Sequence, residues 1–260
     1  MRLCEQEAKA MLSELYVTGI KLARPIEAGN YLQDLPVVRH LQTMDELPIA
    51  KPVTFFIGEN GVGKSTLIEA IAVSMGFNPE GGTINFNFAT RNSHSDLFRY
   101  LTVCKGVRHQ KDGFFLRAES FYNVATNIDQ MDAEPSFDPP VISYYGGVSL
   151  HKQSHGESFM KLVEKRFGGN GLYILDEPEA ALSPSRLLQL ICHMDDLVKR
   201  RSQFIISTHS PVLMAFPGAE VFELSESGIA SVPYQETEHF RIIRQFLNAP
   251  DKMLKYLLEK

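Results

Sequence analysis

Residues 58–66 read Gly-Glu-Asn-Gly-Val-Gly-Lys-Ser-Thr. Gly58, Gly63, Lys64 and Ser65 follow the spacing glycine, four residues, glycine, lysine and serine or threonine, which is typical of phosphate-binding loops. Glycine permits a positive φ and lets the backbone come close to an anion. Backbone N–H groups would then hold phosphate oxygens, Lys64 would reach β- and γ-phosphates, and the Ser65 hydroxyl would bind Mg²⁺.

The expected nucleotide-contacting set is continuous along this loop, and its members are Glu59, Asn60, Gly61, Val62, Gly63, Lys64, Ser65 and Thr66. We expect the Lys64 side chain to point into a solvated loop. The segments on either side of the motif indicate whether it forms a phosphate-binding loop. Residues 52–57 form a short apolar run that predicts a buried strand, and residues 65–73 have apolar side chains at helical spacing before Gly76. Strand, loop and helix favour a phosphate site over a chance glycine-rich turn.

Two further apolar runs end in side chains that could do chemistry. Residues 171–175 predict a buried strand that ends in Asp176 and Glu177, and residues 203–207 predict another that leads to His209. Ligands of open parallel sheets bind at the carboxyl ends of strands. There Asp176 could hold Mg²⁺, and Glu177 could accept a proton from an attacking water. The simpler alternatives are a capped strand-end acidic pair and a core or capping histidine.

Composition places the chain among ordinary globular proteins. It has 260 residues, of which 44% are hydrophobic and 22% charged, and its net charge is −5. This charge gives no general attraction to nucleic acid or acidic lipid. Cys4, Cys104 and Cys192 match no metal spacing and predict reduced thiols in a cytoplasmic protein. No secretory signal or long apolar span is visible, so we expect no direct membrane insertion.

The remaining segments predict an α/β chain with an antiparallel region. A loop-rich passage containing Pro25, Gly29, Pro36 and Pro48 precedes the phosphate-loop strand. Residues 129–140 are acidic, contain proline and predict an exposed loop. The other expected strands are 15–22, 83–88, 99–104 and 113–118, with a hairpin turn at 111–113 between the last two. The other expected helices are 5–14, 121–128, 157–167, one that begins at 183–184, 236–248 and 251–259.

Together, the segments GENGVGKST, QSHGES, LYILDEPEAALSP and STHSP resemble the ATPase domain of the ABC superfamily. The likeness is greatest to its soluble branch of SMC-like and DNA-repair ATPases, and to small stand-alone bacterial ATPases of this type. The resemblance implies an α/β P-loop NTPase fold, with a mostly parallel core sheet flanked by helices and an antiparallel β patch. It also implies one domain over 1–260, with antiparallel and signature-helix insertions roughly within 81–170.

The resemblance assigns roles residue by residue. Asp176 and Ser65 would hold Mg²⁺, Glu177 would be the catalytic glutamate, and His209 would contact the γ-phosphate and the attacking water of ATP. Ser154, Gly156 and Glu157 would belong to the family signature, a helix start that binds the γ-phosphate held by the opposite subunit. Residues 180–183 stand where the family has its dimer-contacting loop.

Two departures from the family pattern concern the same part of the chain. His155 occupies a place that the family usually gives to glycine, which would make a close backbone approach there harder. No clear glutamine loop lies between the phosphate loop and the signature, and Glu119 is the candidate for its metal-contacting position. Taken alone, QSHGES is equally compatible with an ordinary exposed helix start.

Three functions fit these observations. The first is Mg-dependent ATP hydrolysis by a head-to-tail homodimer that drives a conformational change in a protein or DNA partner. The second is an ATP-gated nucleic-acid or protein binding module with little turnover, against which Glu177 and His209 argue. The third is the ATPase subunit of a transporter.

Overall fold

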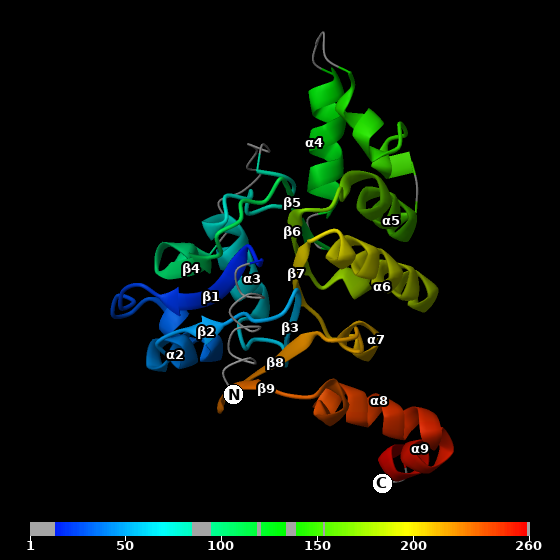
Figure 1. The fold of residues 1–260 in the computed structure, drawn as a ribbon. Coiled ribbons are helices and arrows are strands. Elements are labelled where there is room, and N and C mark those ends of the chain that lie inside the picture. The colour runs from blue at the N-terminus through cyan, green and yellow to red at the C-terminus, as the bar shows by residue number, and fades with distance from the viewer. Residues whose placement is uncertain (1–13, 85–94, 119–120, 134–138, 153, 259–260) are drawn as a thin grey trace.

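The computed structural model describes residues 14–84, 95–118, 121–133, 139–152 and 154–258. Its centre is a six-stranded sheet (Figure 1) in the order β5-β6-β7-β3-β8-β9. Neighbouring strands are parallel except for β8 and β9, which are antiparallel. The strands span β3 (Val53–Gly58), β5 (Asp112–Arg117), β6 (Gly171–Asp176), β7 (Gln203–Ser207), β8 (Glu220–Ser225) and β9 (Gly228–Ser231).

Both faces of this sheet are covered, which explains why its inner strands β3, β6 and β7 are buried along their whole length. Alternate residues of β3 contribute to different hydrophobic clusters, as Phe55 and Phe56 illustrate. Phe55 packs with the helices α4 (Phe121–Ala133), α5 (His155–Arg166), α6 (Pro184–Lys199) and α7 (Pro211–Met214). Phe56 packs with α3 (Lys64–Ser74), α2 (Pro36–Thr43) and a smaller sheet. In Figure 1 the helices α4 to α7 lie on one side of the main sheet, and α2, α3 and the smaller sheet lie on the other side.

The smaller sheet is antiparallel, in the order β2-β1-β4. It consists of β1 (Val17–Leu22), β2 (Leu47–Pro48) and β4 (Leu101–Lys105). The buried Gln203 side chain joins it to the main sheet: its Oε1 atom accepts from the N–H groups of Tyr16 and Val17, both at 2.9 Å, and its Nε2 atom donates to the Val17 carbonyl at 2.8 Å. One amide thus satisfies three backbone groups between the sheets.

The remaining elements are short 3₁₀ helices and a C-terminal helical pair. The pair, α8 (Glu238–Asn248) and α9 (Pro250–Leu258), projects beside β8 and α7 in Figure 1. No helix of the described residues is both long enough and apolar enough to cross a bilayer. The 3₁₀ helices are η1 (Tyr31–Asp34), η2 (Asp96–Arg99), η3 (Val141–Tyr145), η4 (Leu150–Lys152), η5 (Pro178–Ala181) and η6 (Tyr234–Glu236).

The expected hairpin between residues 99–104 and 113–118 is wrong. Strands form in both places, but β4 pairs with β1, whereas β5 pairs in parallel with β6. The Asp112-Gly113 pair begins β5 for reasons of packing. The Asp112 carboxylate accepts from Arg166 Nη1 at 2.6 Å and from the Tyr173 hydroxyl at 2.7 Å. A Cβ on Gly113 would lie 2.7 Å from the Phe77 ring.

Two segments expected as loops are helical. The passage before the phosphate-loop strand contains α2, in which Pro36 is a first-turn residue and not a loop marker. Helix α4 continues to Ala133 and so enters the expected acidic loop. Most of the helix expected at 5–14, most of the strand expected at 83–88, and Glu119 lie outside the described residues.

Candidate active site

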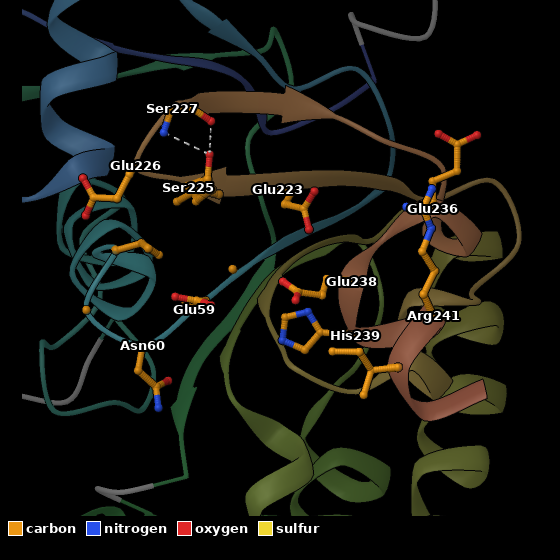
Figure 2. A pocket seen from close by; sticks show the side chains of 15 residues that line it. Glu59, Asn60, Glu223, Ser225, Glu226, Ser227, Glu236, Glu238, His239 and Arg241 are labelled. Atoms are coloured by element: carbon orange, nitrogen blue, oxygen red, sulfur yellow. Dashed lines mark hydrogen bonds between the residues drawn. The ribbon is translucent and has the colours of Figure 1, made fainter. Parts of the chain in front are cut away.

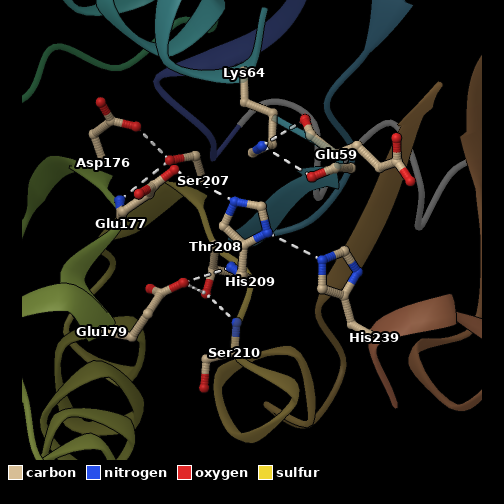
Figure 3. A network of polar contacts seen from close by, with 11 residues as sticks. Glu59, Lys64, Asp176, Glu177, Glu179, Ser207, Thr208, His209, Ser210 and His239 are labelled. Carbon is tan, nitrogen blue, oxygen red and sulfur yellow. Dashed lines mark hydrogen bonds and ion pairs between the residues drawn. The ribbon is translucent and has the colours of Figure 1, made fainter. Parts of the chain in front are cut away.

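The phosphate loop, the acidic pair and His209 meet at one edge of the main sheet. They follow β3, β6 and β7, which are adjacent and parallel, so their carboxyl ends lie together. Ser207 is in register with Asp176 on one side and with Phe56 on the other. Figure 3 shows Lys64, Asp176, Glu177 and His209 converging at this edge.

The phosphate loop requires its glycines. Gly58, Gly61 and Gly63 have φ values of 142°, 88° and 97°, in the region that favours glycine. A Cβ on Gly58 would lie 2.2 Å from the Leu224 carbonyl oxygen, and one on Gly63 would lie 2.5 Å from Val37 Cγ1. The loop is therefore wedged between β8 and α2, which fixes the direction of its N–H groups.

Lys64 is buried, contrary to the expectation of a solvated side chain. Only 4% of the residue is exposed, and its Nζ atom donates to the carbonyl oxygens of Gly58 and Glu59, both at 2.9 Å. Burial lowers the pKa of Lys64, while the nearby Glu177, Asp176 and Glu179 carboxylates favour its charged form. The carboxylates thus help to keep a cation at the start of α3.

Asp176 is a buried carboxylate held from two sides. Its Oδ1 atom accepts from the Ser207 hydroxyl at 2.5 Å, and its Oδ2 atom lies 3.6 Å from Arg117 Nε. Arg117 also pairs with Glu69 of α3, at 2.5 Å. Carboxylate and hydroxyl oxygens suit Mg²⁺, which usually takes further oxygen ligands from phosphate and water. Asp176 and the half-buried Ser65 therefore fit the expected metal role chemically.

Glu177 is turned toward His209 by an unusual backbone conformation. Its φ and ψ are 50° and 53°, a left-handed conformation that is rare for a residue with a side chain. Its N–H donates to the Ser207 carbonyl at 3.1 Å, which holds this turn in place. The Glu177 Oε1 atom then lies 3.4 Å from His209 Nε2. Conformations of this kind cluster at functional sites.

Two residues that the sequence analysis did not single out hold His209 in place. The Glu179 carboxylate accepts from the backbone N–H of His209 at 2.5 Å and from the Thr208 hydroxyl at 2.8 Å. His239 of α8 meets the ring from the other side, with 3.0 Å between its Nε2 atom and His209 Nδ1. The pKa of His209 is lowered to about 4 by burial, by the charge of Lys64 and by the neighbouring His239. Its imidazole is therefore neutral at physiological pH.

The expected signature residues form a separate group at the start of α5. The Glu157 carboxylate accepts from the Ser154 hydroxyl at 2.8 Å and from its N–H at 3.2 Å, and both residues are exposed. Gly156 lies against η5, because a Cβ there would be 3.0 Å from the Ala181 carbonyl oxygen. Ala181 belongs to the expected dimer loop. The signature and that loop therefore form one surface.

A cavity of about 840 Å³ adjoins the outer side of the phosphate loop (Figure 2). Its opposite walls are the turn between β8 and β9 and the first half of α8. Arg241 is the cation among its lining residues, against five carboxylates: Glu59, Glu223, Glu226, Glu236 and Glu238. These would repel a polyphosphate. The loop N–H groups beside Lys64 are the better place for phosphate.

Two family models match the chain, each over one part of the site. Residues 40–111, which contain the phosphate loop, match a model described as "AAA domain". Residues 153–215, which contain the signature, the acidic pair and His209, match "AAA domain, putative AbiEii toxin, Type IV TA system". The two matches between them cover every motif described above.

Individual relatives share little sequence identity with this chain. An "Uncharacterized ABC transporter ATP-binding protein" of Haemophilus influenzae is 24% identical over 204 residues, which cover 73% of this chain and 75% of the relative. Two solved structures are similar in outline. CbiO1 from Clostridium perfringens, titled part of the ABC transporter complex cbiONQ, has a TM-score of 0.48 at 17% identity and covers 95% and 100% of the two chains. The SMC head domain from Thermotoga maritima has a TM-score of 0.43 at 16% identity and covers 84% and 99%.

Three of the motifs that the family models match in sequence meet at one sheet edge in space, whereas the expected signature lies apart at the start of α5. They are a glycine-dependent phosphate loop, a strand-end acidic pair and a histidine after the adjacent strand. The two AAA-domain matches and the similarity to an ABC transporter ATP-binding protein support an ABC-superfamily ATPase.

Proposed function

We propose that the chain binds Mg·ATP at the phosphate loop and hydrolyses it, working as a head-to-tail homodimer with ATP in the interface. The observation that carries the proposal is the 3.4 Å contact between Glu177 and His209 at the sheet edge where Lys64 and Asp176 also lie. A site that only bound ATP would need the loop and the lysine, but it would not need a base and an imidazole beside them.

Each side chain has one task in this mechanism. Lys64 exchanges its bonds to loop carbonyls for β- and γ-phosphate oxygens. Ser65 and Asp176 would hold Mg²⁺, which would supply positive charge to offset the negative charge of the phosphates. Glu177 accepts a proton from water as the water oxygen bonds to the γ-phosphorus and the bond to the bridging oxygen breaks. His209 donates from Nε2 to the charge that develops on the γ-phosphate.

The exposed start of α5 supports the dimer. Ser154 and the first N–H groups of this solvent-exposed helix start would bind an anion once the Ser154 hydroxyl exchanges its bond to Glu157 for a phosphate oxygen. In the head-to-tail arrangement this helix start would contact the γ-phosphate bound to the phosphate loop of the other copy. We expect ATP binding and release to drive a conformational change in a protein or DNA partner, as in the SMC-like branch. We propose a cytoplasmic location, which the free thiols of Cys104 and Cys192 support.

A second candidate is the ATPase subunit of a transporter, which the name of the Haemophilus influenzae relative favours. Both candidates require ATP hydrolysis and differ in what is coupled to it. Copurification of a membrane permease with the Glu177→Gln variant would favour the transporter. Copurification of DNA or a non-membrane protein would favour the first.

The test of hydrolysis is multiple-turnover phosphate release with Mg·ATP in excess over protein. We expect Glu177→Gln and His209→Ala each to lower turnover by a factor of order 10² or more, because each removes a group that acts in the transition state. ATP affinity, measured by calorimetry, should change little. Turnover within about twofold of wild type in both variants would show that this site does not carry the reaction.

A further inference from the structure

A second histidine, His239, contacts the ring of His209. His239 is the second residue of α8, and the two imidazole centroids lie 5.2 Å apart with 49° between the ring planes. The mechanism proposed above uses Nε2 of His209, and His239 contacts the other ring nitrogen, Nδ1. Figure 3 shows His239 reaching His209 from an element that carries none of the expected motifs.

The contacts determine which nitrogen holds each proton. An ionised carboxylate can only accept, so Glu177 beside His209 Nε2 favours a proton on that atom. A neutral His209 then has a lone pair on Nδ1, which needs a donor. His239 Nε2, at 3.0 Å, is positioned to be that donor. The tautomer of an imidazole is set by the hydrogen bond that its other nitrogen makes.

The environment of the other ring nitrogen of His239, Nδ1, is consistent with a proton on its Nε2. Its Nδ1 atom is buried and has no hydrogen-bond partner among the described residues. If Nε2 carries the proton, this buried atom is a lone pair and not an orphaned N–H. The alternative, a doubly protonated His209, would donate to His239 Nε2 and place an unpaired N–H at that buried atom. Burial also lowers the pKa of His209, which disfavours that cation.

The start of α8 is built to hold His239 in place. Its N-cap residue Thr237 is fully buried, donates to the Tyr234 carbonyl at 2.7 Å and accepts from the Phe240 N–H at 3.3 Å. The rings of Tyr234 and Phe240 meet edge-on with centroids 5.3 Å apart. Helix α8 itself contains no buried residue among those described. The helix is therefore anchored at the turn that carries His239.

We propose that His239 is a positioning residue whose Nε2–H holds His209 in the tautomer that directs its own Nε2–H toward Glu177 and the γ-phosphate. The inference rests on the proposed function for its consequence, but not for its geometry. It makes the ATPase site depend on the docking of α8, an element that is neither part of the sheet nor part of any ABC motif identified in the sequence.

The direct test is the ¹⁵N spectrum of the histidine rings in the wild-type protein at neutral pH, without nucleotide. Both His209 and His239 should show a protonated Nε2 and an unprotonated Nδ1. A proton on Nδ1 of His209 would overturn the proposal, whatever the protein hydrolyses. Absence of ATP hydrolysis with the expected tautomers would instead reject the proposed function and leave the hydrogen bond established.

Two variants give the functional readout. In His239→Gln the side-chain amide can still donate to His209, and we expect the tautomer and turnover within a few-fold of wild type. In His239→Leu the donor is gone, and we expect a mixed tautomer and turnover about 10- to 100-fold lower, with ATP affinity and the unfolding midpoint nearly unchanged. His193→Leu is the control, since His193 is half-exposed on α6 beside Glu164. Equal losses in the Gln and Leu variants would refute a positioning role.

Discussion

The two helix starts expected to bind phosphate, those of α3 and α5, differ in how complete they are. The start of α3 has a buried cation, three glycines with positive φ, and neighbours on both sides. The start of α5 has the exposed Ser154 and Glu157, which satisfy each other. A Cβ on Gly156 would lie nearest to Ala181 of η5 and Arg186 of α6.

This difference indicates that the two sites have different roles in binding ATP. The α3 site has everything that binding a phosphate requires within one chain. The α5 site offers a hydroxyl and helix N–H groups on an open surface, which bind weakly while exposed to water. Such a surface binds an anion well only when a second subunit covers it. Substitutions at α3 should therefore affect the monomer, and substitutions at α5 should affect association.

The largest effect is expected for Lys64→Ala. Loss of the buried ammonium should weaken ATP binding by about 100-fold or more, which corresponds to about 3 kcal/mol. Because Lys64 also bonds two loop carbonyls, its removal should lower the free energy of unfolding by about 1–3 kcal/mol. Calorimetry and urea unfolding measure the two effects. Ser154→Ala is the matched control for ATP affinity, which should not change in the monomer. Unaltered ATP affinity in Lys64→Ala would contradict the assignment of the phosphate loop.

A smaller contrast is expected between two glycine substitutions. Gly63→Ala places a Cβ at positive φ and 2.5 Å from Val37 Cγ1, so it should cost about 1–3 kcal/mol of stability or more and also weaken ATP binding. Gly156→Ala gains about 0.5–1 kcal/mol of helix propensity, which crowding against Ala181 offsets. Urea unfolding should separate the two. Equal destabilisation by Gly63→Ala and Gly156→Ala would show that the start of α5 is packed as closely as the start of α3.

Much of the site could be predicted from the sequence, because its geometry is local. The glycines near Lys64, the apolar run before Asp176 and the run before His209 each determine their own strand and strand end. Parallel pairing then brings those ends together. Glu179 and His239 were missed because their roles depend on contacts about 30 residues away along the chain, with Thr208 and His209. Nothing in the sequence around His239 indicates that its helix docks there.

The errors in the fold have the same origin. Asp112 and Gly113 have the composition of a hairpin turn, but they stand at the start of a strand where Arg166, Tyr173 and Phe77 require them. Pro36 is a residue type typical of loops, but it begins α2, the helix that supports the phosphate loop through Val37. In each case the local residue type was compatible with two structures, and long-range packing determined which one formed.

The measurement that tests the account most directly is the mass of Glu177→Gln in solution, determined by light scattering during size exclusion with and without Mg·ATP. Glu177→Gln keeps the side-chain shape but removes the base, so ATP should accumulate a dimer at tens of micromolar protein. Adding Ser154→Arg places bulk and charge on the exposed start of α5, and this double variant should stay monomeric while it still binds ATP through Lys64. A Glu177→Gln protein that remains monomeric with saturating Mg·ATP, or a double variant that dimerises equally well, would contradict the shared site.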